Sequence, residues 1–392
     1  MLKRSMIKIA LPVAASALVL SACGSDDDSG DGGKTYTIGF QAGLSGENAQ
    51  LGINEANGAE LAVVQWNNQP NVPFKIKLTK SDDEASETKA ASAAQKLIDD
   101  SKVIAVIGPA FSGPTKASGA LYAQAKLATV SPSATNPTLT DPSNGFTSLL
   151  RGVPNDFAQG SGMATYYAQK LKLKKVLIVD DKSEYGVGLS DVAKAELTKA
   201  GVQVVSESVP KGTPDYTSAA TTVKNSGADG MIYAGYYQDA APFAKKLKEQ
   251  GVKIPMISGD GTNDPKFIEL AGDAADNWYL TCPCTDAKVE PATKDFTTAY
   301  TAQFKEAPST YSAESFDLTN MVIQEIKKLD EAGTKITREL MLTNLKKASY
   351  KGLTKTFSFD EKGEFAGKGI YLYEVKAGKI GYLGNIEELA KS

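Results

Sequence analysis

The stretch VIAVIGPAFSGPTKASGALYAQAKLATVSPSATNP, residues 103–137, contains one complete unit of the fold. Its first run, 103–110, is short and rich in Val and Ile, which is typical of a buried strand. Residues 113–124 then have helical periodicity, and a second apolar run ends in SPSATNP, 131–137, where two prolines interrupt strand pairing. A strand, a helix and a strand in this order predict a parallel pair, because parallel strands need a long crossover connection.

The same alternation continues on both sides of this unit, from Tyr36 to short final strands at 370–375 and 379–382. It pauses at Pro154 and starts again with a helix over 156–170. Strands that alternate with helices indicate a parallel sheet covered by helices, so we expect an α/β fold with two doubly wound parallel-sheet lobes. Further strands are expected over 35–44, 74–83, 175–181, 202–210, 230–237, 254–261 and 277–284, and helices over 52–67, 86–99, 185–200, 216–226, 239–250, 293–305 and 312–332.

Composition and charge exclude several classes of function. The formal charge is -3, and removal of residues 1–22, which carry three cationic side chains and no acid, makes it -6. A surface for nucleic acid is therefore not expected. The absence of histidine excludes His-based triads and imidazole bases, so an enzyme would have to use carboxylates, Lys or Tyr. Because the sequence has neither a P-loop nor a GxGxxG after its first strand, no nucleotide cofactor is expected.

The N-terminal segment has the features of a lipoprotein signal peptide, which would span residues 1–22. Three cationic residues precede an apolar run over 9–20. The run leads into LSAC, residues 20–23, whose last residue is Cys23. The run is shorter than the about 20 residues that cross a bilayer. We expect lipidation of Cys23 and attachment to the outer side of the cell membrane, at a bacterial surface or in a periplasm. Cleavage at another site and an uncleaved anchor are the alternatives.

Residues 23–34 contain GSDDDSGDGG, which is too polar to pack and predicts a flexible tether. Its aspartates lack the spacing and the final Glu of an EF-hand, so a calcium site is not expected. Cys282 and Cys284 in TCPCTD can form a local disulfide or remain two free thiols. Alpha carbons two residues apart in an extended segment lie about 6.5 Å apart, near the upper limit for a disulfide. A metal site is not expected here, because no histidine can complete it.

Loops at the carboxyl ends of strands are where open α/β sheets bind ligands. Ser112 precedes a helix, where it can cap the helix or bind an anion with free backbone N–H groups. Thr135 lies between two prolines that leave backbone groups unpaired, unless the segment is only a turn. Tyr185 and Tyr236 follow strands and can face a cleft or pack on their own helices. Asp260 stands between two glycines and suits an ammonium group, with a turn or helix-entry role as the alternative.

These segments together resemble a branched-chain amino-acid (leucine/isoleucine/valine) binding protein, the periplasmic-binding-protein type I component of an ABC transporter. The resemblance implies two lobes joined by three crossovers, near 151–155, 284–286 and 357–367. The first lobe would comprise 35–153 plus 287–366, and the second 154–286 plus 367–392. The segments that carry the similarity are TIGFQAGLSG, NGAELAV, IGPAFSGPTKAS, SPSATNPTLT, DDKSEYGVGL, YAGYYQDA, SGDGTND and FSFDEKGEF.

The resemblance also implies a role for each loop residue. Ser112, with the hydroxyl and backbone N–H of Thr135, would bind the α-carboxylate of an amino acid. Asp260, the backbone carbonyl of Ser133 and the hydroxyl of Tyr185 would bind its ammonium group. A buried charge is tolerated only when it is paired, so both lobes would have to contribute.

Departures from the family pattern concern specificity. Tyr236 would form a wall of the side-chain pocket, and Leu51 stands where a leucine-binding family member has a tryptophan. Asp260 is one methylene shorter than the family's Glu, and Phe111 replaces a cysteine of the family's disulfide. The ligand could therefore be an amino acid other than leucine, or a small amide.

The resulting hypothesis is an extracytoplasmic solute-binding lipoprotein, not an enzyme, that delivers a branched-chain or other aliphatic amino acid to a membrane permease. It would be a monomer, without cofactor, metal or nucleic acid, anchored to the membrane by its lipid. The alternatives are a receptor for urea, short amides or aromatic acids, a ligand sensor, and a carboxylate-based enzyme.

Overall fold

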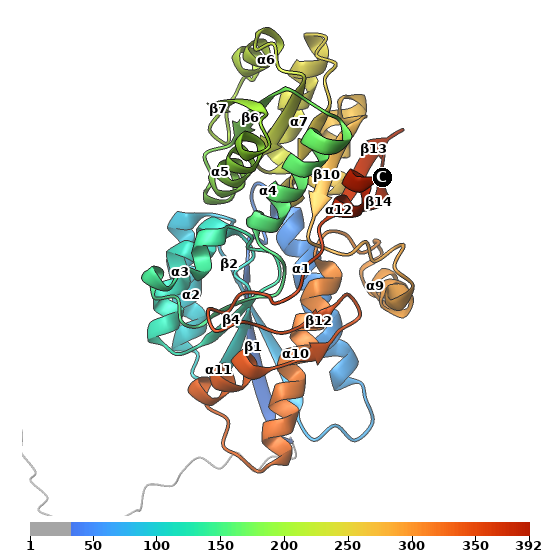
Figure 1. The fold of residues 1–392 in the computed structure, drawn as a ribbon. Coiled ribbons are helices and arrows are strands. Elements are labelled where there is room, and N and C mark those ends of the chain that lie inside the picture. Colours follow the sequence, from blue (N-terminus) through green and yellow to red (C-terminus); the bar gives the residue numbers. More distant parts are fainter. Residues whose placement is uncertain (1–32) are drawn as a thin grey trace, which may run out of the picture.

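Two β-sheets, which lie one above the other in Figure 1, divide the chain into two lobes. The structure is a computed structural model, and it describes residues 33–392. The predicted signal peptide, Cys23 and all but the last two residues of the tether lie outside this range. Between residues 33 and 392, no helix is both long and apolar enough to cross a membrane.

The sheet of the first lobe has five parallel strands in the order β2-β1-β3-β4-β5. Helices cover both of its faces, which explains why a strand such as β3 is a continuous apolar run. Helices α1 and α10 pack together on one face, and α2 and α3 on the other (Figure 1). The elements are β1 (Thr35–Ala42), α1 (Ala49–Asn67), β2 (Lys75–Asp82), α2 (Glu87–Asp99), β3 (Val103–Ile107), α3 (Ser112–Gln124), β4 (Ala128–Ser131), β5 (Leu149–Arg151), α9 (Lys294–Phe304), α10 (Ser312–Glu331), α11 (Arg338–Lys347), and the short pair β11 (Tyr350–Lys351) and β12 (Thr356–Phe357).

The sheet of the second lobe has seven strands in the order β14-β13-β10-β9-β8-β6-β7. The five from β7 to β10 are parallel, whereas the C-terminal hairpin of β13 and β14 is added antiparallel to β10. This sheet is therefore mixed at one edge. The elements are α4 (Asp156–Thr165), β6 (Lys175–Asp180), α5 (Glu184–Lys199), β7 (Gln203–Ser208), α6 (Thr217–Asn225), β8 (Gly230–Ala234), α7 (Tyr237–Glu249), β9 (Met256–Ser258), α8 (Pro265–Ala271), β10 (Trp278–Cys282), β13 (Tyr371–Lys376), β14 (Lys379–Asn385) and α12 (Ile386–Lys391).

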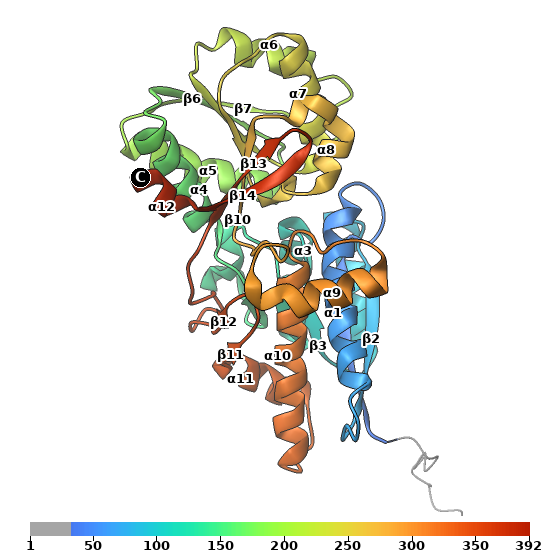
Figure 2. The same cartoon turned by 90° about the vertical axis from the view of Figure 1, so that its right-hand side faces the viewer.

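The chain passes between the two lobes three times (Figure 2). The first connection joins β5 to α4, the second joins β10 to α9, and the third joins β12 to β13. The first and third are tied by an ion pair in which Arg151 Nη2 lies 2.7 Å from Glu364 Oε1. The α/β fold with two lobes and three crossovers is thus confirmed. The exact lobe boundaries, including 153/154 and 366/367, stay a prediction.

Most of the expected elements are present, with shifts of a few residues at their ends. The helix expected over 156–170 is α-helical only to Thr165 and continues as a π-helical turn to Lys170. The strand expected over 230–237 ends at Ala234, because Tyr237 already belongs to α7. Three short helices, α8, α11 and α12, were not foreseen.

Candidate functional site

A cavity between the lobes lies at the carboxyl ends of four parallel strands, where β3, β4, β8 and β9 lead into loops. Its empty volume is about 280 Å³. Part of this volume is open to solvent, so the enclosed space is small. The cavity is lined by Leu51, Glu55, Ala110, Phe111, Ser112, Ser133, Tyr185, Tyr236, Asp260, Gly261 and Tyr311.

Six of the seven residues predicted to bind ligand therefore meet in one cavity, although they are spread over about two hundred positions of sequence. Thr135 is the exception, because it does not line the cavity. A wider groove elsewhere on the second lobe, lined by Lys248, Met256 and Glu374 among others, contains none of the predicted residues.

Asp260 is the most strongly hydrogen-bonded group of the cavity. Its Oδ1 accepts hydrogen bonds from Gln159 Nε2 at 2.7 Å and from the Tyr185 hydroxyl at 2.9 Å. Its Oδ2 accepts one from the Tyr311 hydroxyl at 2.9 Å. Asp260 is also the first residue of a short 3₁₀ turn, Asp260–Thr262, so it does stand at a helix entry as the local alternative expected, but its side chain caps no helix and lines the cavity. Burial raises the pKa of the carboxyl group, although all three donors favour its ionised form.

The two lobes meet at this carboxylate. Tyr185 belongs to α5 of the second lobe, whereas Tyr311 stands directly before α10 of the first lobe. The alternative in which Tyr185 packs only on its own helix is wrong, because its hydroxyl reaches Asp260. The Tyr311 hydrogen bond thus joins one lobe to the other through a charged group.

The loop before α3 differs from the expected cap. Ser112 is the first residue of the helix, and Phe111 occupies the N-cap position with an extended backbone. The Ser112 hydroxyl instead accepts a hydrogen bond from the backbone N–H of Asn136 at 3.2 Å. The capping prediction for Ser112 is therefore wrong, but the start of α3 still faces the cavity, as an anion site requires.

The loop after β4 supplies Ser133 and, one layer further from the cavity, Thr135. The Ser133 hydroxyl donates to the carbonyl of Ala110 at 2.6 Å, which ties this loop to the end of β3. The Thr135 hydroxyl is buried and has no hydrogen-bond partner among the described residues, while its carbonyl accepts the N–H of Asp156 at 2.9 Å. In this structure the hydroxyl does not face the cavity, and it lies close enough to the Asp156 carboxyl group to lower the pKa of that group.

Apolar and aromatic side chains surround the remaining space. The rings of Tyr185 and Tyr236 lie 5.1 Å apart, and those of Tyr236 and Phe111 lie 5.4 Å apart. Leu51, from α1, lines the same cavity and is almost fully buried. The arrangement combines an apolar wall with polar groups at a few positions, as in sites for small amphiphilic molecules.

Three residues of the site were missed by sequence analysis. Gln159 lies behind Asp260, and its Oε1 accepts the Thr281 hydroxyl at 3.0 Å. Tyr311 has a φ of 64°, an unusual value for an aromatic residue that no local pattern predicts. Glu55 lies one helical turn after Leu51, and this spacing on the same helix face could have identified it.

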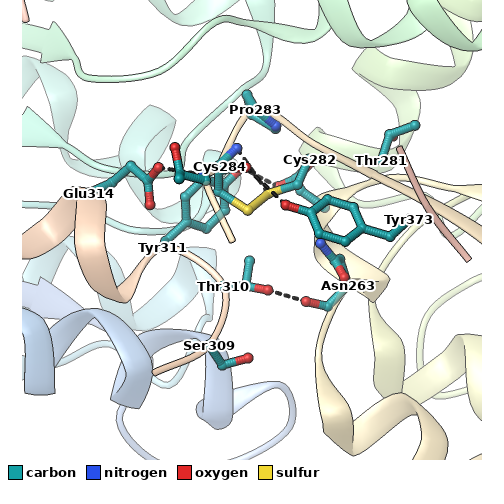
Figure 3. Close-up of a disulfide and its surroundings, with 12 residues drawn as sticks. Asn263, Thr281, Cys282, Pro283, Cys284, Ser309, Thr310, Tyr311, Glu314 and Tyr373 are labelled. Atoms are coloured by element: carbon teal, nitrogen blue, oxygen red, sulfur yellow. Dashed lines mark hydrogen bonds between the residues drawn. A yellow bond between two sulfur atoms is a disulfide. The ribbon is translucent and has the colours of Figure 1, made fainter. Parts of the chain in front are cut away.

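Cys282 and Cys284 form a disulfide at the second connection between the lobes (Figure 3). Their alpha carbons lie 5.0 Å apart, closer than in an extended chain, because Pro283 turns the segment. Groups from both lobes hold the same segment. Lys355 donates to the carbonyl of Pro283 at 2.8 Å, and the Tyr373 hydroxyl donates to that of Cys284 at 3.2 Å. Within residues 33–392, no cluster of His, Cys, Asp or Glu is arranged to bind a metal.

Comparison with known proteins places this geometry in a family. The sequence profile of the family described as "Periplasmic binding protein" matches residues 35–379. A Leu/Ile/Val-binding protein, BraC3 from Rhizobium johnstonii, is 31% identical over 350 residues, which cover 88% of this chain and 92% of that protein.

Two solved structures have the same architecture. The branched-chain amino acid substrate-binding protein LivJ from Streptococcus pneumoniae, in complex with isoleucine, is 30% identical and has a TM-score of 0.79, with 90% of this chain and 100% of that chain covered. The leucine-binding protein LivK from Thermotoga maritima is 25% identical and has a TM-score of 0.81, with 89% and 98% covered. The expectation of a binding protein rather than an enzyme is confirmed by these relatives. The chain therefore belongs to the periplasmic binding protein family, as a member of its branch of extracytoplasmic substrate-binding proteins of branched-chain amino acid ABC transporters.

Proposed function

We propose that this protein binds a free amino acid, branched-chain or otherwise aliphatic, between its lobes and delivers it to the permease of an ABC transporter. The observation that supports the proposal most directly is the cavity itself. A hydrogen-bonded carboxylate of the second lobe faces a helix N-terminus and hydroxyl groups of the first lobe, with an apolar wall between them. A zwitterion with an apolar side chain presents complementary groups.

In this proposal the first lobe binds the α-carboxylate and the second lobe contributes the charge that pairs with the ammonium group. Ser112 and the α3 N-terminus, with Thr135, would receive the carboxylate. Asp260, Tyr185 and the carbonyl of Ser133 would receive the ammonium group. Among the residues that the structure describes, one donor, the Tyr311 hydroxyl, reaches Oδ2 of Asp260, so this oxygen keeps a lone pair for the ligand.

The side chain of the ligand would contact Leu51, Phe111 and Tyr236. Leu51 is smaller than the tryptophan that the family resemblance places there, so this wall leaves more room for a branched side chain. The small cavity volume favours an aliphatic amino acid over a large aromatic one.

Delivery would depend on the N-terminal segment. A lipid on Cys23 and a flexible tether over 23–34 would keep the monomeric receptor beside its permease at high local concentration. A sensor that reports the same ligand to a partner protein would use the same cavity, and transport assays in cells distinguish the two roles.

A thermal-shift panel on the purified protein tests the proposal. It compares aliphatic amino acids with urea, short amides and aromatic acids, because a ligand that binds only the folded state raises the melting temperature with the logarithm of its concentration. We expect stabilisation by an aliphatic amino acid and none by urea or benzoate. Stabilisation by a neutral amide alone would contradict the proposal.

A further inference from the structure

Glu55 is a second carboxyl group in the cavity, and neither the prediction nor the proposed function assigns it a role. It lies on α1, one turn after Leu51, and only 1% of its surface is exposed. Its Oε2 is buried and has no hydrogen-bond partner among the described residues. A buried polar atom without a partner is costly, so this oxygen is expected to meet a group that the ligand brings.

Close packing on both sides fixes the position of Glu55. A Cβ at Gly52 would lie 2.1 Å from the carbonyl oxygen of Gly43, and one at Gly58 would lie 2.1 Å from that of Ser312. The Ser315 hydroxyl also donates to the backbone carbonyl of Glu55 at 2.7 Å. Helix α1 therefore packs closely against α10 and against the residue after β1, and this packing places the carboxyl group at the cavity.

The other charged residue that lines the cavity is also an acid. Asp260 lines the same cavity from the opposite lobe, and no Lys or Arg of residues 33–392 lines it. The acids Asp83, after β2, and Glu314, on α10, also act on Glu55, and Glu314 is itself ion-paired with Lys355, whose Nζ lies 3.1 Å from its Oε1. Burial raises the pKa of the Glu55 carboxyl well above its usual value, and the three acids raise it further, whereas Ser133 lowers it.

We propose that Glu55 is a second ligand-contacting carboxylate, which together with Asp260 selects a ligand carrying a cationic group and keeps the empty lobes apart. The identity of that cationic group as the ammonium of an amino acid rests on the proposed function. Closing the empty cleft brings two carboxylates from different lobes into one small cavity with no cation. A ligand ammonium between them removes this repulsion, so ligand binding drives closure.

Protonation of Glu55 removes the same repulsion between the two carboxylates that a ligand cation would remove. The closed empty state holds a proton on Glu55 more tightly than the open state, where water surrounds the carboxyl group. Acid therefore favours closure of the empty protein, and this effect requires Glu55.

Small-angle scattering from the ligand-free protein tests the scheme without any knowledge of the ligand. We compare the wild type, Glu55→Gln and Asp239→Asn at neutral pH and at pH values down to about 5, where the proteins remain folded by circular dichroism. Asp239 is a matched control, because it is also buried with an unpartnered Oδ2 but does not line the cavity. At neutral pH the radius of gyration of Glu55→Gln should be smaller than those of the wild type and the control. On acidification the wild type should contract and Glu55→Gln should not.

Equal radii for the three proteins, or the same contraction in Glu55→Gln as in the wild type, would overturn the proposal. If the glutamine variant does not fold, the pH response of the wild type alone tests the proposal. A wild-type protein that does not contract on acidification would then contradict it.

Calorimetry with L-isoleucine and its deaminated analogue provides the second measurement. Glu55→Gln should reduce the preference for isoleucine over the analogue by about tenfold or more, whereas Asp239→Asn should not change it. The ratio of the two dissociation constants does not depend on the equilibrium between open and closed lobes, since both ligands need the closed state. An unchanged ratio would exclude Glu55 as a ligand contact and leave the proposed function intact. If no amino acid binds, the proposed function fails, and the scattering result still decides whether Glu55 keeps the lobes apart.

Discussion

Asp260 is the carboxylate that the second lobe contributes to the cavity, and three donors of the protein hydrogen-bond to it. Replacing it with alanine removes this charge and this acceptor. The hydroxyls of Tyr185 and Tyr311 lose their acceptor, and the Gln159 amide loses one of its two, since it also donates to Asp156. In the proposed complex, the ligand ammonium also loses its partner. Truncating one member of a buried, hydrogen-bonded charge pair costs about 2–5 kcal/mol of binding free energy. The dissociation constant for the amino acid should therefore rise by about 30-fold to several thousand-fold.

The assay is isothermal titration calorimetry with the amino acid that gives the largest thermal shift. Asp260→Asn separates charge from shape, because asparagine fills the same space and can still accept a hydrogen bond, and it should lose most of the affinity too. Asp239→Asn controls for loss of a buried acid on the same lobe. Circular dichroism and the melting temperature show whether each variant is folded. A folded Asp260→Ala protein whose affinity falls less than about threefold would refute the assignment of the ammonium site.

Three further predictions concern the lobes and their connections. Tyr311→Phe removes a hydrogen bond to a charged group between the lobes, worth about 1.5–3 kcal/mol, and should weaken amino-acid binding about tenfold or more. Tyr300→Phe, whose hydroxyl has no hydrogen-bond partner among residues 33–392 and does not line the cavity, should not weaken it. Serine at both Cys282 and Cys284 should lower the free energy of unfolding, measured in urea, by only about 1.5 kcal/mol, because the disulfide closes a very short loop. A loss above about 4 kcal/mol would show that the disulfide does more than constrain the unfolded chain. Burial raises the pKa of Asp317 to about 6 from 3.8, so the stability it contributes is present below pH 3.8 and lost as the pH rises through about 6. The free energy of unfolding of the wild type relative to Asp317→Asn should therefore fall over this pH interval by about 3 kcal/mol at most. Urea unfolding at several pH values measures this difference, and a difference that stays constant with pH would contradict the raised pKa.

The α/β architecture was predictable because the inner strands of a covered parallel sheet are apolar on both faces and therefore stand out along the chain. The run at Val103–Ile107 is an example, since all five of its residues are buried. The antiparallel addition of β13 to β10 was not predictable in the same way. Both strands were expected, but their pairing joins segments about ninety residues apart and leaves no local pattern.

The site shows the same division between local and tertiary information. Asp260, Tyr185 and Ser112 follow strands or begin helices, and that position made them candidates. Glu55 and Gln159 lie within helices and reach the site only through packing of those helices. The cap role expected of Ser112 failed because the extended backbone at Phe111, with φ of -99° and ψ of 145°, starts the helix one residue earlier.

The central claim is that the cavity binds both charged ends of an amino acid. Isothermal titration calorimetry with L-isoleucine, its deaminated acid and its decarboxylated amine tests the claim on one protein under one set of conditions. The account predicts that isoleucine binds at least about a hundredfold more tightly than either analogue, because each analogue leaves one half of the site unpaired. Binding of either analogue as tight as that of isoleucine would contradict it.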